Sequence, residues 1–547
     1  MTFRHPILKP SCALGFAALL ACAASLPVRA QPRVWKGVVW AAPADVAHAE
    51  ADLIRMRAAG VEAVRTGLVR EERLLSLADT LGLRLFQELP LDALPAARLA
   101  DTLAFARETL RRALARARGH RSARHFGLAR RSDTSDPEAC DFFRALAGMR
   151  PDGVRLYYVS AFTTADRCRD AVDFALLDAR DRLPPVTDWT GRGLATLGAW
   201  VDPDGPPGLR NPHAPEAQAR FLETHLNALL DAANPPVAVF VHRWRDADPD
   251  APDADPEPPD PYGRRYGLHD RAGRPRPAFD VMAGIYTGRQ RVFAFPPGRA
   301  PGPGAPWIVL IGWAVVAMIA GHYVRSPRFR FMAPRYFLAH GFYCDAVREG
   351  RDVLPMTSAL LLLAIAVSVG MTASVVFGAI LDSRAMMSAL QWLPGSVRIT
   401  LAGLLRQPWL LALTAGSLYA LALAVWAGVL ALVARRRRPL APGQVFMLVV
   451  WPRWTLLPLM VAAMVLASQP VSAGAAPALA GAWLLLTLWA TARTLLDFSR
   501  ITRAPLSRTL TAALTHPFVL LGAPACFLAA AFFGPWLSFL RHLITRL

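Results

Sequence analysis

The chain has 547 residues, 54% of them hydrophobic, and a formal net charge of +20 at pH 7. The length exceeds what a single hydrophobic core organises, and the apolar share is too high for an ordinary soluble domain. The charge comes mostly from arginines in loops between apolar runs, without a nucleic-acid-binding motif, so we exclude nucleic acid as a partner and expect these arginines to orient a membrane protein.

Residues 1–30 are typical of a secretory signal peptide. A basic start is followed by the apolar stretch CALGFAALLACAASL, and VRA before Gln31 offers small residues at the −3 and −1 positions of a cleavage site. The sequence therefore predicts that the segment after residue 30 is exported. Two alternatives stay open, namely an uncleaved N-terminal anchor and a weak lipoprotein box that would lipidate Cys22.

Residues 31–288 alternate apolar runs of strand length with amphipathic helical runs. The eight expected strands are VWKGVVW, VEAVRTGL, LRLFQELPLD, SARHFGLA, VRLYYVSAF, VDFALLDA, LATLGAWVD and PVAVFVHRW. Repeated βα units predict a parallel sheet, and eight units in this length fit an α/β fold of the (β/α)8 TIM-barrel type. A doubly wound open sheet is the alternative, although no glycine-rich phosphate loop follows the first strand.

Two proline-rich segments interrupt the pattern. Residues 245–261 alternate Asp and Pro, which excludes a helix or an inner strand and predicts an acidic loop after the last strand. Residues 289–306, which contain PPGRAPGPGAP, predict a Pro/Gly linker.

Residues 307–547 predict a polytopic transmembrane domain, an all-α bundle of about six helices. Six apolar segments approach the roughly 20 residues that cross a bilayer. They are residues 307–324, 354–381, 408–433, 446–467, 478–496 and 516–540. Almost no ionisable residue lies inside them, which disfavours an ion or proton pathway.

The arginine pattern of the loops predicts the orientation of these spans. Loops 325–353, 434–445 and 497–515 are rich in Arg, and the alternate loops are poorer. By the positive-inside rule, the barrel and the C-terminal end lie on the non-cytoplasmic side. We therefore expect a multi-pass protein of a bacterial-type inner membrane, with a periplasmic barrel in contact with the lipid bilayer.

Of the six cysteines, only Cys140 and Cys168 are expected in an oxidising compartment. They follow the fourth and fifth strands, which are neighbours in a (β/α)8 barrel, so a disulfide between them is possible. Two buried free thiols are the alternative. The cysteine spacing indicates no metal site, and no cofactor is expected.

Candidate functional residues follow the C-terminal ends of the strands, where (β/α)8 barrels place their chemistry. Aromatic rings, an arginine and a few carboxylates suit a saccharide, because rings stack on the apolar face of a sugar and polar groups bind its hydroxyls. Barrel packing is the alternative for each residue. The candidate saccharide-binding residues are Trp40, Arg65, Glu88, Trp200, His242 and Trp244.

Four runs resemble, in order and spacing, motifs of the (β/α)8 retaining glycosidases that include β-galactosidases and mannanases. They are MRAAGVEAVRTGL, LADTLGLRLFQELPLD, GHRSARHFGLARRSD and RYGLHDRAGRPRPAFDVM. The similarity covers roughly residues 35–285, and Arg65 matches the arginine that lines the sugar pocket of that family. The apolar half loosely resembles Yip-like multi-span domains.

The resemblance also implies two catalytic glutamates, one after strand four and one after strand seven. Retaining glycosidases need two carboxylates, and this chain has Arg131 and Ala199 at those positions. Arginine cannot act as a general acid and alanine can serve neither role. The resemblance therefore implies a catalytically degenerate barrel that binds a saccharide without cleaving it.

Two other functions stay open. A slipped alignment would let Asp133, Glu88 or Asp178 supply a displaced pair, which would keep an active membrane-tethered glycosidase. The chain could also be a transport or assembly component, with membrane-protein partners and the barrel as an accessory.

Overall fold

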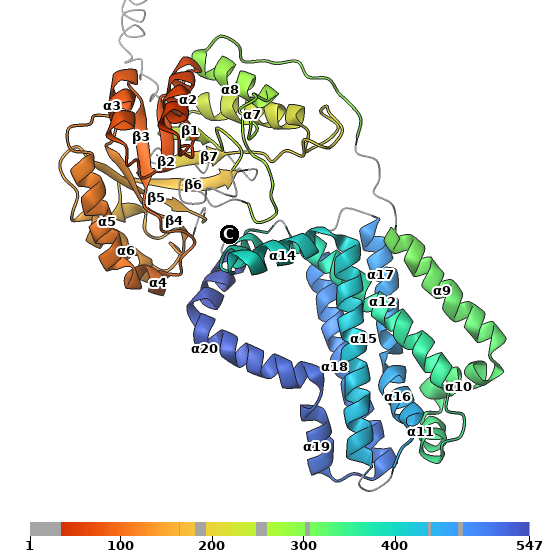
Figure 1. Cartoon of the computed structure of the whole chain (residues 1–547). Helices are drawn as coiled ribbons and strands as arrows, with labels where there is room; N and C mark the ends of the chain where they lie inside the picture. Colours follow the sequence, from red (N-terminus) through yellow and green to blue (C-terminus); the bar gives the residue numbers. More distant parts are fainter. Residues whose placement is uncertain are drawn as a thin grey trace, which may run out of the picture.

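The computed structural model describes most of the chain in eight segments. These are residues 34–162, 165–180, 193–247, 260–300, 307–381, 383–435, 439–468 and 474–545. The predicted signal peptide lies outside them, as do most of the predicted acidic loop and one third of the predicted linker. Figure 1 shows a barrel followed by a helical region.

The first part is a closed barrel of eight parallel strands in sequence order. The barrel closes because β1 pairs in parallel with β8, which confirms the (β/α)8 prediction and shows that the open-sheet alternative is wrong. The strands are β1 (Trp35–Val39), β2 (Ala63–Gly67), β3 (Arg84–Glu88), β4 (His125–Ser132), β5 (Arg155–Ser160), β6 (Phe174–Arg180), β7 (Gly193–Leu197) and β8 (Ala238–Val241).

Helices cover the outside of this barrel (Figure 1). They are α2 (Val46–Ala58), α3 (Glu72–Leu81), α4 (Ala96–Asp101), α5 (Leu103–Arg116), α6 (Pro137–Ala147), α7 (Pro215–Leu230) and α8 (Pro277–Thr287), with a 3-10 turn, η1 (Arg169–Ala171), after β5. Because side chains alternate along a strand, Val38 packs outward in the helix-facing core while its neighbour Val39 lies in the inner cluster with Phe86 and Phe240.

The second part is all α-helical. Its helices are α9 (Trp307–Arg325), α10 (Pro327–Leu338), α11 (His340–Glu349), α12 (Pro355–Ile380), α13 (Arg384–Gln391), α14 (Gly395–Arg406), α15 (Pro408–Ala434), α16 (Pro442–Val450), η4 (Trp451–Leu456), α17 (Leu457–Ala467), α18 (Ala475–Thr502), α19 (Leu506–Leu514) and α20 (Pro517–Thr545). Six helical units are long and apolar enough to cross a membrane: α9, α12, α15, α16 to α17, α18 and α20. The predicted number of spans is confirmed.

Glycines bring two of these spans into close contact. A Cβ on Gly370 of α12 would lie 2.2 Å from the Ala412 carbonyl oxygen of α15, and a Cβ on Gly416 would lie 2.5 Å from the Ala366 carbonyl oxygen. Small residues allow helix backbones to approach in this way inside a membrane. In contrast, no residue in the most apolar stretch of α20 is buried, so this span leaves the bundle and reaches toward the barrel (Figure 1).

Candidate functional site at the barrel mouth

A buried ion pair lies at the centre of the barrel mouth. Arg65 Nε, on β2, donates to Glu88 Oε1, on β3, at 2.6 Å, and Arg65 Nη2 donates to Glu88 Oε2 at 3.2 Å. Both side chains are only 1% exposed. Arg65 Nη1 also donates to the Thr196 hydroxyl of β7 at 3.3 Å, so the arginine links β2 to a strand that is not its neighbour in the barrel.

Two further groups bind the Glu88 carboxylate. The Tyr157 hydroxyl, on β5, donates to Glu88 Oε1 at 3.0 Å. Burial raises the pKa of Tyr157 well above its ordinary value, and the neighbouring Glu88 carboxylate raises it further, so the phenol keeps its proton and acts as the donor. Arg130 Nε lies 3.9 Å from Glu88 Oε2. The carboxylate is therefore surrounded by two guanidinium groups and a phenol.

This network fits together because residue 127 of β4 is a glycine. A Cβ at Gly127 would lie 2.8 Å from Glu88 Cγ and 2.9 Å from Tyr157 Cζ. A larger residue would push apart the acid and its donor.

The two arginines at the end of β4 lie in different places. Arg130 approaches Glu88 and is 7% exposed, and its Nε and Nη1 have no hydrogen-bond partner among the described residues. Arg131, which the sequence resemblance aligns with a catalytic glutamate, forms a bidentate pair with Asp92 through Nε, at 3.1 Å from Oδ1, and Nη2. Arg130, which is not among the binding residues predicted from the sequence, is thus the second arginine of the network beside Arg65.

The other two carboxylates that could form a displaced catalytic pair, Asp133 and Asp178, are also hydrogen-bonded or buried. Asp133 Oδ2 lies 2.8 Å from His542 Nδ1 of α20, and its Oδ1 accepts from the Ser135 hydroxyl at 2.6 Å. Asp178 is a buried residue on β6. Ala199 lies beyond the end of β7, where its carbonyl accepts from Gln218 of α7.

The four aromatic and histidine candidates have different environments. Trp40 is buried on the outer side of β1 and donates to Asp52 of α2 at 3.2 Å. Trp244 belongs to the same outer core and contacts Phe279 of α8. His242 is buried against Tyr266, at 5.1 Å between ring centroids. Of these, His242 continues β8, whereas Trp40 and Trp244 are packing residues.

Trp200 lies at a separate cavity of about 380 Å³ next to α7. Its indole stacks on His213 at 3.5 Å between ring centroids, and the Arg264 guanidinium lies 5.3 Å from the ring. Ala199, Arg220 and His225 also line this cavity.

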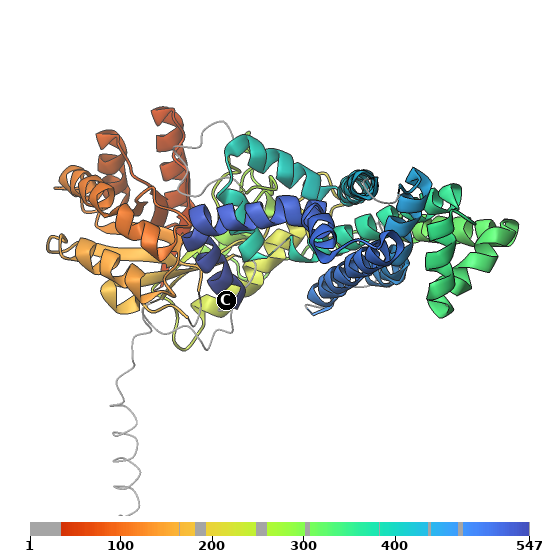
Figure 2. The same ribbon diagram turned by 90° about the horizontal axis from the view of Figure 1, so that it is seen from below.

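Helices of the second part cover the mouth. Figures 1 and 2 show α14 and the C-terminal end of α20 beside the barrel. Trp392, which follows α13, donates to the Ala93 carbonyl at 3.1 Å, and Arg384 and Arg406 donate to the carbonyls of Ala161 and Tyr262. All three acceptors lie in loops at the C-terminal ends of the strands.

Apolar contacts extend this cover. Phe539 and Leu543 of α20 pack with Phe162, which follows β5. Tyr262, which follows β8, packs with Leu390 of α13 and Leu405 of α14. No local sequence pattern indicates these contacts, because they join segments that are far apart in the chain.

The paired cysteines lie beside this rim. Cys140 of α6 and Cys168, just before η1, form a disulfide with a Cα–Cα distance of 4.9 Å. In the part of the chain that the structure describes, the one group of three side chains that could hold a metal lies in the helical region instead, at His340, Cys344 and Asp497.

Comparisons with known proteins give similarity of structure only. No protein-family model matches the chain. No curated protein sequence matches it either. The resemblance of the helical region to Yip-like domains therefore stays an expectation.

Among solved structures, the chain is similar to glycosidases. One is a GH2 β-galacturonidase from Eisenbergiella tayi bound to galacturonate, with 16% identity over 48% of this chain and 52% of that chain, and a TM-score of 0.40. Another is the β-glucuronidase from Ruminococcus gnavus in complex with D-glucaro 1,5-lactone, with 13% identity over 46% of this chain and 49% of that chain, and a TM-score of 0.38. The chain spans about half the length of these structures, and the values are too low to support an argument about activity or ligand.

Proposed function

We propose that the barrel is a glycoside-hydrolase-like domain that binds a saccharide without cleaving it and that the helical region anchors it in a membrane. The observation that carries this proposal is the state of Glu88. A glycosidase needs one carboxyl group that holds a proton and a second that is free to attack or to activate water. Both oxygens of Glu88 already accept hydrogen bonds, from Arg65 and Tyr157, so this carboxyl group is occupied as an acceptor.

Arg130 suggests the class of saccharide. Its buried guanidinium has two nitrogen atoms, Nε and Nη1, without hydrogen-bond partners in the described part of the chain. Unpaired donors of a buried arginine suit a planar acceptor such as a carboxylate, or a phosphate. We therefore expect an acidic saccharide, carrying a uronate or a phosphate substituent, to bind more tightly than a neutral one.

The helices that cover the mouth suggest the route by which this ligand would reach the barrel. Helix α14 buries Ala402 and Leu405 toward the barrel side while Val397 and Ile399 stay 48% and 71% exposed. A helix with an exposed apolar face beside membrane spans is suited to the membrane–water interface. A saccharide that reaches Arg130 would therefore enter between the barrel and the membrane surface.

The proposed side of the membrane is the exported one. The Cys140–Cys168 disulfide is favoured in an oxidising compartment, and the arginine-rich loops lie at the opposite ends of the spans. Both observations support a periplasmic barrel in a bacterial-type inner membrane.

Binding and hydrolysis measured on the same saccharides test this proposal. The full chain in detergent should bind oligosaccharides that contain uronate more tightly than neutral ones of the same length. Arg130→Ala should weaken the uronate ligand roughly tenfold or more, since a charge-assisted hydrogen bond contributes about 1.5–3 kcal/mol. Arg131→Ala is the matched control, because Arg131 is paired with Asp92.

A hydrolysis assay on the same saccharides tests the alternative of an active glycosidase. We expect no cleavage of any saccharide that binds. Cleavage by the unmodified chain that is abolished by Glu88→Gln, Asp133→Asn or Asp178→Asn would show that the carboxylates are displaced and not lost.

A further inference from the structure

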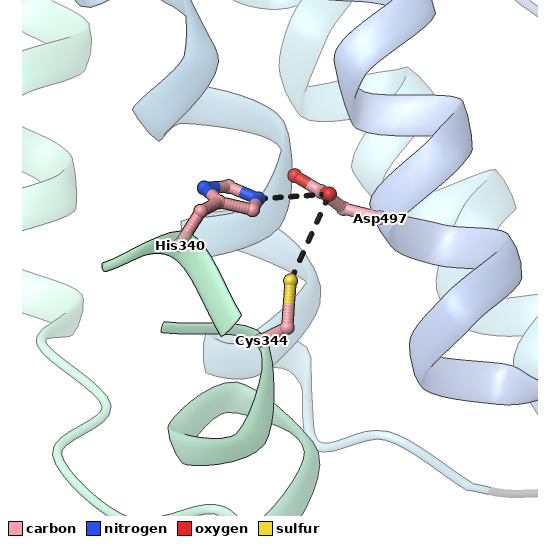
Figure 3. A group of neighbouring side chains, drawn as sticks. All are labelled: His340, Cys344 and Asp497. Carbon is pink, nitrogen blue, oxygen red and sulfur yellow. Dashed lines mark hydrogen bonds and ion pairs between the residues drawn. The ribbon is translucent and has the colours of Figure 1, made fainter. Parts of the chain in front are cut away.

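Three potential metal ligands converge in the helical region, at the end away from the barrel (Figures 1 and 3). His340 and Cys344 are one turn apart on α11, and Asp497 faces them from α18. The ligand atoms of the three side chains all lie within 4.8 Å of one another. The Asp497 side chain is 1% exposed and the His340 side chain 15% exposed.

Both ring nitrogens of His340 face hydrogen-bond acceptors. Nδ1 lies 3.0 Å from the Tyr336 carbonyl oxygen, and Nε2 lies 2.9 Å from Asp497 Oδ1. A neutral imidazole has a proton on one nitrogen only, so it can satisfy one of these acceptors. If Nδ1 donates to the carbonyl, the lone pair of Nε2 points at the carboxylate. In that tautomer Nε2 is placed to bind a metal ion together with the carboxylate.

The other atoms of the cluster favour the metal ion. Cys344 Sγ lies 3.7 Å from the same Asp497 Oδ1 (Figure 3). Asp497 Oδ2 is buried and accepts no hydrogen bond from the described residues. The nearest charged group to Oδ2 is Arg493, whose Nε lies 3.6 Å away. A metal ion can be bound by all three side chains at once, because their ligand atoms lie within 4.8 Å of one another.

We propose that His340 Nε2, Cys344 Sγ and the Asp497 carboxylate bind a Zn²⁺ ion. Imidazole nitrogen, thiolate and carboxylate oxygen are the ligands that Zn²⁺ takes, and it binds four of them in a tetrahedron. Three protein ligands leave one position for water. The Tyr336 carbonyl supplies the outer hydrogen bond that fixes the tautomer of a metal-bound histidine.

The positive charges of two arginines near the site disfavour the binding of a cation. Arg493 Nε lies 3.6 Å from Asp497 Oδ2, and the buried Arg453 donates to Thr494, one turn before Asp497. The thiolate and the carboxylate together carry two negative charges, which balance the two positive charges of Zn²⁺. The ion therefore adds no net charge to the cluster, which lies beside the buried end of α18.

Binding exchanges protons for the metal. Metal binding requires a neutral imidazole and a thiolate. Any proton on His340 Nε2 or Cys344 Sγ therefore leaves as Zn²⁺ binds, and the thiolate and the carboxylate balance the two charges of the ion. The release is measurable by calorimetry in buffers with different ionisation enthalpies.

Cobalt provides a direct readout of the thiolate ligand. We would purify the full chain in detergent under reducing conditions, remove metals with a chelator and titrate Co²⁺. The expected result is a thiolate-to-cobalt charge-transfer band that saturates at one equivalent and disappears when Zn²⁺ is added. Cys344→Ser should abolish the band, and His340→Gln or Asp497→Asn should weaken binding roughly 10-fold to 100-fold or more, since changes in outer partners alone cost that much.

The second free cysteine of the described chain gives the matched control. Cys526 lies on α20, is exposed, and should be replaceable by Ser without effect on the band. Zn²⁺ should also raise the melting temperature of the unmodified chain and of Cys526→Ser, but not that of Cys344→Ser. The proposal is overturned if the unmodified chain shows no saturable band, or if the band survives in Cys344→Ser. The result with the unmodified chain tests the proposal even if a variant fails to fold.

Discussion

An irregularity in β4 determines which of two adjacent arginines enters the mouth. The register between β4 and β5 shifts between Gly127 and Arg130 and again between Arg130 and Ser132. Arg131 has a φ of 45°, in the left-handed region that residues other than glycine rarely adopt. The backbone turns at this point, so Arg130 points toward Glu88 and Arg131 toward Asp92.

Single residues of the site could be predicted from the sequence in part. Arg65 and Glu88 are predicted from their places in β2 and at the end of β3, and their side chains form an ion pair in the mouth. Trp40 was selected by the same rule, but it follows the inward Val39 and therefore points outward, where it contacts Asp52. The direction of a side chain at a strand end is therefore set by the alternation along the strand and by β-bulges, and its place at the end alone does not predict it.

Removing the acid of the central ion pair should destabilise the barrel strongly. Glu88→Ala leaves the 1% exposed Arg65 without its charge partner. The loss of one partner of a buried pair costs about 3–5 kcal/mol, which lowers the melting temperature of a domain this size by roughly 10 °C. A thermal melt of the full chain in detergent measures this.

An exposed ion pair provides the control for that experiment. Arg73, whose side chain is 76% exposed, pairs with Glu50. Glu50→Ala should cost about 1 kcal/mol or less. Equal shifts for the two variants would contradict the proposed importance of burial at Glu88.

His125 should make the barrel sensitive to acid. Burial, together with the positive charges of Arg84 and Arg155, lowers the pKa of His125 to about 4. Its unfolded pKa is about 6.5, so between pH 6.5 and pH 4 the unfolded chain binds the proton that the folded chain refuses. Stability is therefore lost as the pH falls through this window, by about 3 kcal/mol.

His125→Phe should remove this part of the acid sensitivity. The ring stacks on Phe86 at 4.2 Å between centroids, and its Nδ1 has no hydrogen-bond partner among the described residues, so phenylalanine keeps the main contact. We expect the difference in melting temperature between pH 7 and pH 4.5 to be smaller in the variant. A difference of the same size in both proteins would show that other groups cause the acid sensitivity.

At the scale of elements, the sequence predicts eight strands and six spans from periodicity and apolar length, and each is observed close to its predicted place. The segments expected as loops between the spans are in part helical, because they contain α10, α11, α13, α14 and α19. Contacts between distant segments could not be predicted either. The pairing of Asp133 with His542 and the packing of Tyr262 on α14 involve segments that carry no common motif.

The disulfide between Cys140 and Cys168 should stabilise the barrel mainly through the unfolded state. The two residues are 28 positions apart, so the bridge closes a loop whose entropy corresponds to about 3–4 kcal/mol. Cys140→Ala with Cys168→Ala should lower the melting temperature of the oxidised protein. The same double variant and the reduced unmodified protein should melt close together, and a large gap between them would mean that packing at these positions dominates.

At the scale of the whole molecule, the contact between His542 and Asp133 places the end of α20 on the same side as the barrel. The number of candidate spans is six, and an even number of crossings would return the chain to the side on which it started. The ends of the spans that point away from the barrel connect to α10, α11 and α19 (Figure 1).

Reporter fusions should read this topology directly. A reporter that is active only in the cytoplasm should be silent when fused after residue 545 and active when inserted after Arg503, between α18 and α19. A reporter active only in the periplasm should give the reverse pattern. Activity of the cytoplasmic reporter at residue 545 would mean an odd number of crossings or an inverted barrel.

The helices that cover the mouth all follow the barrel in the chain. Synthesis on the ribosome proceeds in that order, and domains generally fold as units, so the eight strands can close before α13, α14 and α20 exist. Throughout that period the C-terminal ends of the strands have no helical cover. The cover is complete only when α20 has formed and His542 reaches Asp133. A barrel released before α20 is made therefore lacks the partners of Asp133 and Phe162.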